Sequence, residues 1–394
     1  MNQSYSKFEI NSRVIFGKNV LKELIKILKN DFKFKRIGVV VDYNLYKNSK
    51  ETKIFINKIK KGFFKPIIVY YKLKHEPTYE YLDKVKLKFK KEKISLIDCM
   101  IGIGGGSAID LAKGISTLIK NHLPSKKYMG FPTNINKSIP LIAIPSTAGT
   151  GTELAYNAVF IDKKNNIKLG INTKNNYPLL AVLDPILLST SPKQVLINSA
   201  LGALIRSIET YVSPKANTIS KMYSKISFDL IYNNLRKVVN NRKDFSSILN
   251  LQWGAYYSMV ALSNSSSGPA GALGYYFSLN FSVPQGLGYS VSGINVINLN
   301  HKLGFFEYGD FYDLIEKNKT LKLSQDLKSK LFIRSLNRLF KMYNSFELKN
   351  INFNKKEEIK INEFYKIVKA AFQNNPIYFK EKDLTILTKS LFKK

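Results

Sequence analysis

Four apolar runs in the first half of the chain are separated by segments with helical spacing. The runs are RIGVVVDYN (36–44), KPIIVYYKL (65–73), SLIDCMIGIG (95–104) and IPLIAIP (139–145). Continuous apolar runs rich in Val and Ile, alternating with helices, are typical of strands that are buried on both faces of a parallel sheet. The pattern therefore predicts an α/β domain whose sheet is covered by helices on both sides.

From about residue 186 the pattern changes to apolar positions spaced by 3.6 residues. The helices that it predicts are 194–212, 218–240, 246–263 and 326–344. We expect the patch SNSSSGPAG (263–271) to be a loop or a helix break. A chain of 394 residues is longer than one hydrophobic core normally organises. We therefore predict an α/β domain over residues 1–185 and an all-helical domain over residues 186–394.

A glycine-rich turn ends the third apolar run in IGIGGGSAIDLAKGIS (101–116). The strand pattern stops at Ile103, four small residues follow from Gly104 to Ser107, and a helical pattern begins at once. In such a turn the backbone N–H groups and the positive end of the helix point at one spot, which suits an anion such as a phosphate. A tight turn that binds no ligand is the alternative.

A second turn, STAGTGTE (146–153), follows the fourth apolar run and is rich in glycine and small hydroxyl residues. Glycine lets a ligand approach the backbone closely, and hydroxyl groups add hydrogen-bond donors. Either turn alone is weak support for a ligand site. Two of them after parallel strands are stronger support, because ligands of open α/β sheets bind at the carboxyl ends of the strands.

The composition limits the other classes of function. Hydrophobic residues make up 44% of the chain and charged residues 23%, which is typical of a globular protein. No apolar stretch approaches the roughly 18 residues of a membrane helix, and the first residues lack the apolar core of a signal peptide. Cys99 has no second cysteine to pair with, and its apolar neighbours indicate a buried, inert thiol. We expect a cytoplasmic protein without a membrane partner.

The formal net charge of +34 is carried mostly by lysines that are spread along the chain. A single-stranded nucleic-acid site needs aromatic residues interleaved with a basic groove, whereas the aromatic residues here belong to strand and helix patterns. We therefore expect a solvated lysine surface that attracts anionic ligands, and no nucleic-acid partner.

Seven motifs in order along the chain resemble those of the iron-containing (group III) alcohol dehydrogenases, within the dehydroquinate-synthase-like superfamily. They are VIFGKN (14–19, similar to the N-terminal hairpin signature), VVVDYN (39–44), HEPTYE (75–80), GGGSAIDLAK (104–113), IPSTAGTGTE (144–153), LDP (183–185) and QNNPIYFKEKDL (373–384), the last with Ile377 where arginine is usual. The resemblance implies a Rossmann-like dinucleotide-binding domain, a helical C-terminal domain and an NAD(P)-dependent alcohol dehydrogenase or carbonyl reductase. It also implies a homodimer joined through the N-terminal domain.

By this resemblance the first turn holds the cofactor's pyrophosphate through Gly104, Gly105, Gly106 and Ser107. The other implied cofactor contacts are Asp42 at the adenosine ribose, Ser146, Thr147 and Thr150 at the nicotinamide end, Asp110 and Lys168. A structural role is the alternative at three of them: a strand-end turn residue at Asp42, a charge in the first helical turn at Asp110, and a surface lysine at Lys168. A carboxylate at Asp42 favours NAD, because it repels the 2′-phosphate of NADP, although NADP stays open.

The metal ligands of the family are missing from this chain. The resemblance implies one divalent metal held by an aspartate and three histidines, and the matching positions are Gly202, Arg206, Gly271 and Gln285. The chain has only three histidines, and no two of them are close in sequence. A nitrogen-rich metal site of the family type therefore cannot be assembled in any alignment register, and we expect no bound metal.

Without the metal another group has to stabilise the alkoxide that forms in hydride transfer, or the reaction differs. Arg206 offers a permanent cation with five donors, able to polarise a carbonyl or to bind a substrate carboxylate or phosphate, and Gln285 offers a neutral donor. A surface arginine paired with Glu209 is the alternative for Arg206. The aromatic residues Tyr275, Tyr276, Phe277 and Tyr289 either pack in the core or line a reshaped pocket, where a tyrosine hydroxyl can supply a proton.

The sequence favours a metal-independent NAD(P)-dependent oxidoreductase that reduces a small aldehyde or ketone, or oxidises the alcohol. An anionic substrate is expected if Arg206 faces the pocket. Two other hypotheses stay open. One is a catalytically inactive relative that binds a nucleotide or a partner protein, and the other is a lyase or isomerase that uses NAD transiently.

Overall fold

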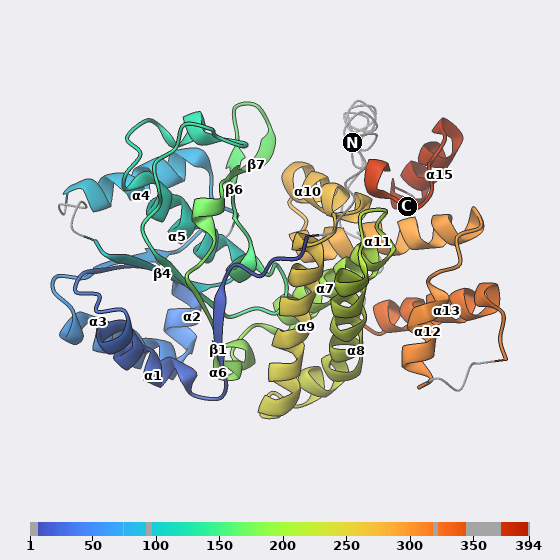
Figure 1. The fold of residues 1–394 in the computed structure, drawn as a ribbon, viewed down its shortest axis with the longest axis horizontal. Coiled ribbons are helices and arrows are strands. Elements are labelled where there is room, and N and C mark those ends of the chain that lie inside the picture. The colour runs from blue at the N-terminus through green and yellow to red at the C-terminus, as the bar shows by residue number, and fades with distance from the viewer. Residues whose placement is uncertain (1–6, 74, 92–96, 318–321, 344–371, 393–394) are drawn as a thin grey trace. The chain divides into compact units, whose positions relative to one another are not determined.

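The computed structural model describes residues 7–73, 75–91, 97–317, 322–343 and 372–392. The chain forms two compact units, which are coloured by residue number in Figure 1. The sheet unit comprises Ile10–Leu196 and Lys237–Gln252, and the helical unit comprises Met1–Glu9, Ile197–Arg236 and Trp253–Lys394. The domain boundary at residue 185 stays a prediction.

A six-stranded parallel sheet with the order β1-β8-β5-β4-β2-β3 forms the centre of the sheet unit (Figure 1). Its strands are β1 (Arg13–Phe16), β2 (Ile37–Asp42), β3 (Ile67–Tyr71), β4 (Cys99–Gly104), β5 (Leu141–Pro145) and β8 (Leu180–Leu183). The prediction of a parallel α/β sheet is confirmed. The similarity of residues 14–19 to a hairpin signature stays a prediction, and in the described residues β1 pairs in parallel with β8.

Alternate residues of the central strands enter two apolar cores, one on each face of the sheet. Val39 and Val41 pack with the helices α1 (Val20–Lys26) and α3 (Lys50–Gly62). Val40 packs with the helices α4 (Tyr79–Lys91) and α5 (Gly106–Leu118) on the opposite face. Strands buried on both faces have no polar side to expose, and this explains why their sequences are apolar runs rather than alternating patterns. Two short helices complete the unit, namely α2 (Tyr43–Asn48) and α6 (Pro185–Ser189).

An antiparallel hairpin packs against α5 and was absent from the sequence prediction. It consists of β6 (Asn157–Asp162) and β7 (Ile167–Asn172), which are separated by a polar turn. Phe160 of β6 is fully buried and lies so close to α5 that a Cβ at Gly114 would be 2.7 Å from its ring. The hairpin therefore forms a layer over α5, on the side of α5 that faces away from the sheet.

The helical unit is built from long helices without strands in its described residues. They are α7 (Lys193–Val212), α8 (Thr218–Asn240), α9 (Phe245–Ser263), α10 (Pro269–Phe281), α11 (Gln285–Lys302), α12 (Gly309–Ile315), α13 (Gln325–Met342) and α15 (Glu381–Phe392). Helices α7, α8, α9 and α13 confirm the four predicted helices. Helix α10 is rich in small and aromatic residues and α11 is buried along most of its length, so both lack the single apolar stripe that marks a surface helix.

The expectation of a buried, inert thiol is confirmed. Cys99 is fully buried in β4, and burial raises the pKa of its thiol above the ordinary value, which keeps it in the unreactive protonated form. None of the described helices combines the length and the apolarity that a membrane span requires.

Candidate functional site

The two glycine-rich turns predicted from the sequence touch each other at the carboxyl ends of β4 and β5. These strands are neighbours in the sheet, with Gly104 paired with Pro145. A Cβ at Gly106 would lie 2.9 Å from the Thr150 hydroxyl oxygen, and one at Gly105 would lie 3.6 Å from the Thr147 methyl group. The first turn and the second turn therefore form one continuous surface, as expected for a site at this edge of the sheet.

The first turn requires glycine for conformational reasons. Gly104 has φ +145, a backbone conformation that side chains rarely adopt, and a Cβ there would lie 2.7 Å from the Cβ of Asp42. Asp42 itself ends β2 and caps α2, because its Oδ1 accepts a hydrogen bond from the Leu45 N–H at 2.9 Å. The structural interpretation of Asp42 is thus confirmed, and its contact with a ribose stays a prediction. Its place beside Gly104 is compatible with both roles.

The N-terminus of α5 opens onto this surface. Gly105 is its N-cap residue and provides no side chain, and Gly105, Gly106 and Ser107 are half-exposed. The first N–H groups of a helix have no partner within the helix, so they bind water, a capping side chain or an anion. Glycines that leave room, an uncapped helix end and the Ser107 hydroxyl together fit the pyrophosphate of a dinucleotide.

Ser146 joins the two turns from the other side. Its N–H donates to the Gly104 carbonyl at 2.9 Å, and its own carbonyl accepts a hydrogen bond from the Ser191 hydroxyl at 2.5 Å. Ser146 is buried, Thr147 is half-exposed and Thr150 is exposed. The second turn therefore presents Thr147 and Thr150 to a ligand more directly than Ser146.

Asp110 lies beneath both turns. Its carboxylate accepts hydrogen bonds from the Thr152 hydroxyl in the second turn and from the Val159 N–H of β6 at 3.2 Å. Burial raises the pKa of Asp110, whereas the nearby Lys113 and these hydrogen bonds lower it. Asp110 is thus more than a charge that complements the helix end, and a direct contact with the cofactor stays a prediction.

The side chain of Lys168 in β7 is buried, which rules out the alternative of a surface lysine, and its contact with the cofactor stays a prediction. Its side chain is 2% exposed, and its Nζ lies 2.6 Å from a carboxylate oxygen of Glu76 in the HEPTYE motif. Burial lowers the pKa of Lys168, and the Glu76 carboxylate opposes this shift. The pair joins the hairpin to the segment that precedes α4, and its 92-residue separation explains why the sequence did not indicate it.

The positions that match the family's metal ligands lie on three helices of the helical unit. Gly202 and Arg206 belong to α7, Gly271 to α10, and Gln285 begins α11. A Cβ at Gly202 would lie 3.2 Å from the Cα of Gly286, so α7 and α11 meet backbone to backbone. Glycine offers no ligand atom and a guanidinium cation repels a metal, so these residues do not fit the metal of the resemblance. In the part of the chain that the structure describes, no three His, Cys, Asp or Glu side chains gather.

A buried polar cluster of Arg206, Glu209 and Tyr289 lies at these positions. Arg206 is 6% exposed and donates from Nε to the Ser258 hydroxyl of α9 at 3.1 Å, so a surface arginine is ruled out. Glu209 accepts hydrogen bonds from the Tyr289 hydroxyl at 2.6 Å and from the Ala270 N–H at 2.7 Å. The cluster therefore links α7, α9, α10 and α11.

The charge of this cluster depends on Glu209. Burial raises the pKa of Glu209 to about 7, although the hydrogen bond from Tyr289 and the charge of Arg206 both lower it. Burial and the Glu209 carboxylate raise the pKa of Tyr289 well above its ordinary value, so its hydroxyl is protonated at neutral pH. Glu209 also lines a small pocket of about 10 Å³, which has room for one water molecule. The one carboxylate in the apolar segment SALGALIRSIETY (199–211), that of Glu209, was the sequence signal that could have indicated its pairing with Tyr289.

Of the four aromatic residues, three lie in the core. Tyr276 and Phe277 belong to the apolar core of α10 and α11, which confirms the packing interpretation, and Tyr289 is 8% exposed. Tyr275 is half-exposed. A catalytic role of the Tyr289 hydroxyl stays a prediction.

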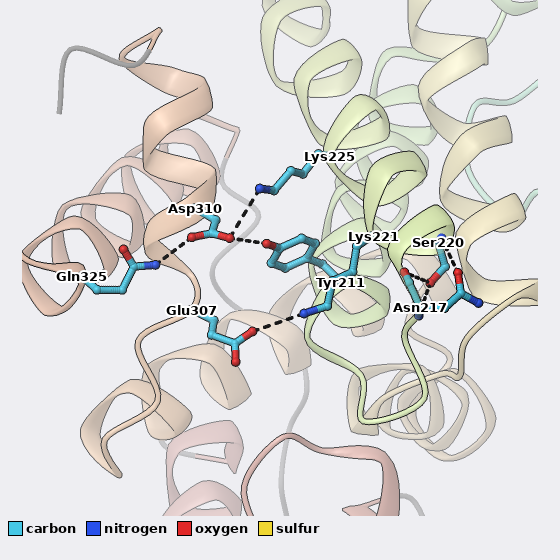
Figure 2. Close-up of polar contacts among 8 residues, drawn as sticks. All are labelled: Tyr211, Asn217, Ser220, Lys221, Lys225, Glu307, Asp310 and Gln325. Atoms are coloured by element: carbon cyan, nitrogen blue, oxygen red, sulfur yellow. Dashed lines mark hydrogen bonds and ion pairs between the residues drawn. The ribbon is translucent and has the colours of Figure 1, made fainter. Parts of the chain in front are cut away.

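Figure 2 shows another polar group of the helical unit, and its members Tyr211, Asn217, Lys221 and Lys225 line an open hollow of about 650 Å³. Lys225 lies 3.4 Å from Asp310 and Lys221 lies 3.5 Å from Glu307, while Tyr211 and Gln325 donate to Asp310. Because these carboxylates neutralise the two lysines, the hollow offers little net charge to an anionic ligand. We interpret the group as a link between α7, α8, α12 and α13.

Comparisons with known sequences match nearly the whole chain. The model of a family described as "Iron-containing alcohol dehydrogenase" matches residues 11–185, and that of "Fe-containing alcohol dehydrogenase family, C-terminal" matches residues 196–392. Alcohol dehydrogenase 4 of Schizosaccharomyces pombe is 30% identical over 282 residues, which are 72% of this chain and 65% of that protein. Sulfoacetaldehyde reductase of Bilophila wadsworthia is 26% identical over 304 residues, 77% of each chain.

A solved structure supports the same fold. Sulfoacetaldehyde reductase from Bifidobacterium kashiwanohense, crystallised in complex with NAD+, superposes with a TM-score of 0.86 at 17% sequence identity, and the match covers 100% of both chains. At this identity the likeness shows the fold, and the α/β sheet with a helical C-terminal part is confirmed.

Replacing Gly106→Ala is expected to weaken NADH binding about tenfold or more, because the new methyl group would meet the Thr150 hydroxyl at 2.9 Å and separate the turns. The matched control is Gly62→Ala at the end of α3, where the methyl group meets only the flexible side chain of Lys29. Fluorescence titration with NADH measures both dissociation constants. Equal affinity of the Gly106→Ala variant and the wild type would show that the contact between the turns has no part in binding.

The raised pKa of Glu209 predicts a pH-dependent stability. Between about pH 4.5 and 7 the folded chain keeps a proton on Glu209 that the unfolded chain releases, so stability falls as the pH rises through this window. Relative to Glu209→Gln, the free energy of unfolding of the wild type should fall by up to about 3 kcal/mol. Urea unfolding at pH 5 and 7.5 measures the difference. Parallel behaviour of both proteins would contradict the buried carboxyl assignment.

Proposed function

The chain belongs to the iron-containing alcohol dehydrogenase family, and from this premise we propose that it is an NAD(P)-dependent oxidoreductase that works without the family's metal. The observation that carries the proposal is the contact between the two glycine-rich turns at the N-terminus of α5. Relatives named as an alcohol dehydrogenase and a sulfoacetaldehyde reductase, and the complex of a structural neighbour with NAD+, support the reaction class and the cofactor.

The bound cofactor supplies or accepts the hydride, and the residues of this chain hold it. The N–H groups at the start of α5 and the Ser107 hydroxyl bind the pyrophosphate, while Thr147 and Thr150 contact the nicotinamide end. Asp42 lies at the end of β2 beside Gly104. Its carboxylate accepts hydrogen bonds from the ribose hydroxyls and repels a 2′-phosphate, so we propose NAD over NADP.

The buried cluster of the helical unit provides the groups that replace the metal's charge. Arg206 places a permanent cation at a position matched to a metal ligand, and Gln285 adds an amide donor at the start of α11. Tyr289 holds a hydroxyl proton beside Gly271, with Glu209 as its partner. A guanidinium cation also binds carboxylate or sulfonate groups, so we propose a small anionic aldehyde or ketone as the substrate. The sulfoacetaldehyde reductase relative supports this substrate class.

A second candidate is a relative that binds the dinucleotide without catalysis. The observation in its favour is that the cluster is satisfied internally, with Arg206 bonded to Ser258 and Tyr289 bonded to Glu209. In that case the cluster replaces the metal as a structural link between helices, and no carbonyl compound is turned over. A lyase or isomerase that uses NAD transiently would hold the nucleotide tightly without net consumption.

Replacing Arg206→Met should lower kcat/KM for reduction of sulfoacetaldehyde by about 10² to 10³, the usual cost of losing one group that stabilises a developing oxyanion. The control is Arg36→Met, a second buried arginine that lies in the sheet unit. The rate of NADH oxidation in metal-free buffer is measured for both variants, with sulfoacetaldehyde as the anionic substrate and propanal as the neutral substrate. Wild-type rates in the Arg206→Met variant would contradict the catalytic assignment, and an inactive wild type would favour the binding-only candidate.

We also propose a homodimer joined through the sheet unit. Strand β1 lies at one edge of the sheet, and its residue Phe16 is 53% exposed. An edge strand can pair with a second chain, so this edge is available for a dimer contact. Light scattering should give about twice the chain mass of 44.9 kDa. Phe16→Asp should shift the mass to that of a monomer, whereas Phe131→Asp, an exposed position outside the strands, should not. A monomeric wild type would contradict the proposal.

A further inference from the structure

Lys113 is a fully buried lysine two turns into α5, and one short segment of the chain surrounds its ammonium group. Its Nζ donates to the Thr152 carbonyl at 2.6 Å, the Thr152 hydroxyl at 2.8 Å, the Ala155 carbonyl at 2.7 Å and the Asn157 carbonyl at 3.0 Å. Its relative exposure is 0%. All four oxygens belong to residues 152–157, which join the second turn to the hairpin.

This segment satisfies only part of its carbonyl groups by itself. The Thr152 carbonyl accepts a hydrogen bond from the Ala155 N–H at 3.2 Å, whereas the Ala155 carbonyl accepts one from Lys113 of α5. Apart from one turn of 3₁₀ helix at Thr152–Leu154, it has no regular structure until β6 begins at Asn157. Buried backbone carbonyls without a partner are costly, and one ammonium group has three protons to share among them. Lys113 therefore provides hydrogen-bond donors to the carbonyls of residues 152–157, as a neighbouring strand does within a sheet.

Asp110 reinforces this contact from the preceding turn of the same helix. It accepts hydrogen bonds from the Thr152 hydroxyl and from the Val159 N–H, so two side chains of α5 bind the segment on both sides of Ala155. The Glu153 carboxylate also faces Lys113, and both acids stabilise its positive charge against the cost of burial. The result is a fixed distance between α5 and the chain that leads out of the second turn.

We propose that Lys113 is a positioning residue for the cofactor site, holding the second turn against the glycine turn. Thr150, which faces Gly106, lies two residues before Thr152, so a shift at Thr152 moves the Thr150 hydroxyl away from the start of α5. The role in binding rests on the proposed function, because the ligand served is the dinucleotide. The role in positioning the second turn does not.

The test compares Lys113→Met with Lys86→Met. Lys86 is a matched control, since it is also buried in the sheet unit and donates to two backbone carbonyls, those of Asn121 and Leu123, away from both turns. Both variants remove an ammonium group that donates to buried backbone carbonyls, and both should unfold at lower urea concentrations than the wild type. Only Lys113→Met should weaken NADH binding, by about tenfold or more, because only that lysine holds the second turn. Equal NADH affinity of the two variants would overturn the proposal.

Hydrogen exchange without nucleotide separates this proposal from the proposed function. In Lys113→Met the peptide covering residues 150–160 should exchange faster than in the wild type, while peptides from β2 and α3 keep their wild-type rates. Thr152→Val, which removes the hydroxyl between Lys113 and Asp110, should have the same local effect in a milder form. Unchanged exchange in both variants would overturn the positioning role. If the wild type does not bind NADH but Lys113→Met still speeds exchange in residues 150–160, the result would contradict the proposed function alone.

Discussion

The close packing of α5 against β4 is the constraint on which the cofactor surface depends. A Cβ at Gly102 would lie 2.9 Å from the Ala112 Cβ, so the helix approaches the strand as closely as glycine permits. This approach places the N-terminus of α5 at the end of β4, next to the turn that follows β5. The same helix then fixes that second turn and the hairpin through Asp110 and Lys113. One helix thus sets the position of both halves of the surface.

In the helical unit, a buried polar cluster lies at the positions that the resemblance matches to metal ligands. Where the resemblance implies an aspartate and three histidines, the chain has two glycines, an arginine and a glutamine. The Arg206 cation, the Glu209 carboxyl group and the Tyr289 hydroxyl lie at the same junction of helices, and each has a hydrogen-bond partner there. The charge of Arg206 lowers the pKa of Glu209, and burial of the carboxyl group opposes this shift and raises the pKa to about 7.

The sequence was sufficient for the parallel sheet, four of the long helices and the two glycine-rich turns, because these features follow from local patterns. The hairpin β6–β7 was not predicted, since apolar and polar residues alternate only weakly along its strands, which are separated by a lysine- and asparagine-rich turn. The hydrogen bonds of Lys113 and the ion pair of Lys168 could not be predicted from the hydrophobic pattern either. Lys113 binds backbone carbonyls 39 to 44 residues away, and Lys168 binds an acid 92 residues away, so neither partner has a local signature. For Arg206 the sequence indicated the position but left its burial open.

The central claim is a working dinucleotide site in a family member that has lost the family's metal ligands. Calorimetric titration of NADH into metal-stripped protein, repeated after adding Fe²⁺ or Zn²⁺, tests it most directly. The account predicts one binding site per chain and the same dissociation constant in both samples. Binding that appears only after metal is added, or no binding in either sample, would contradict it.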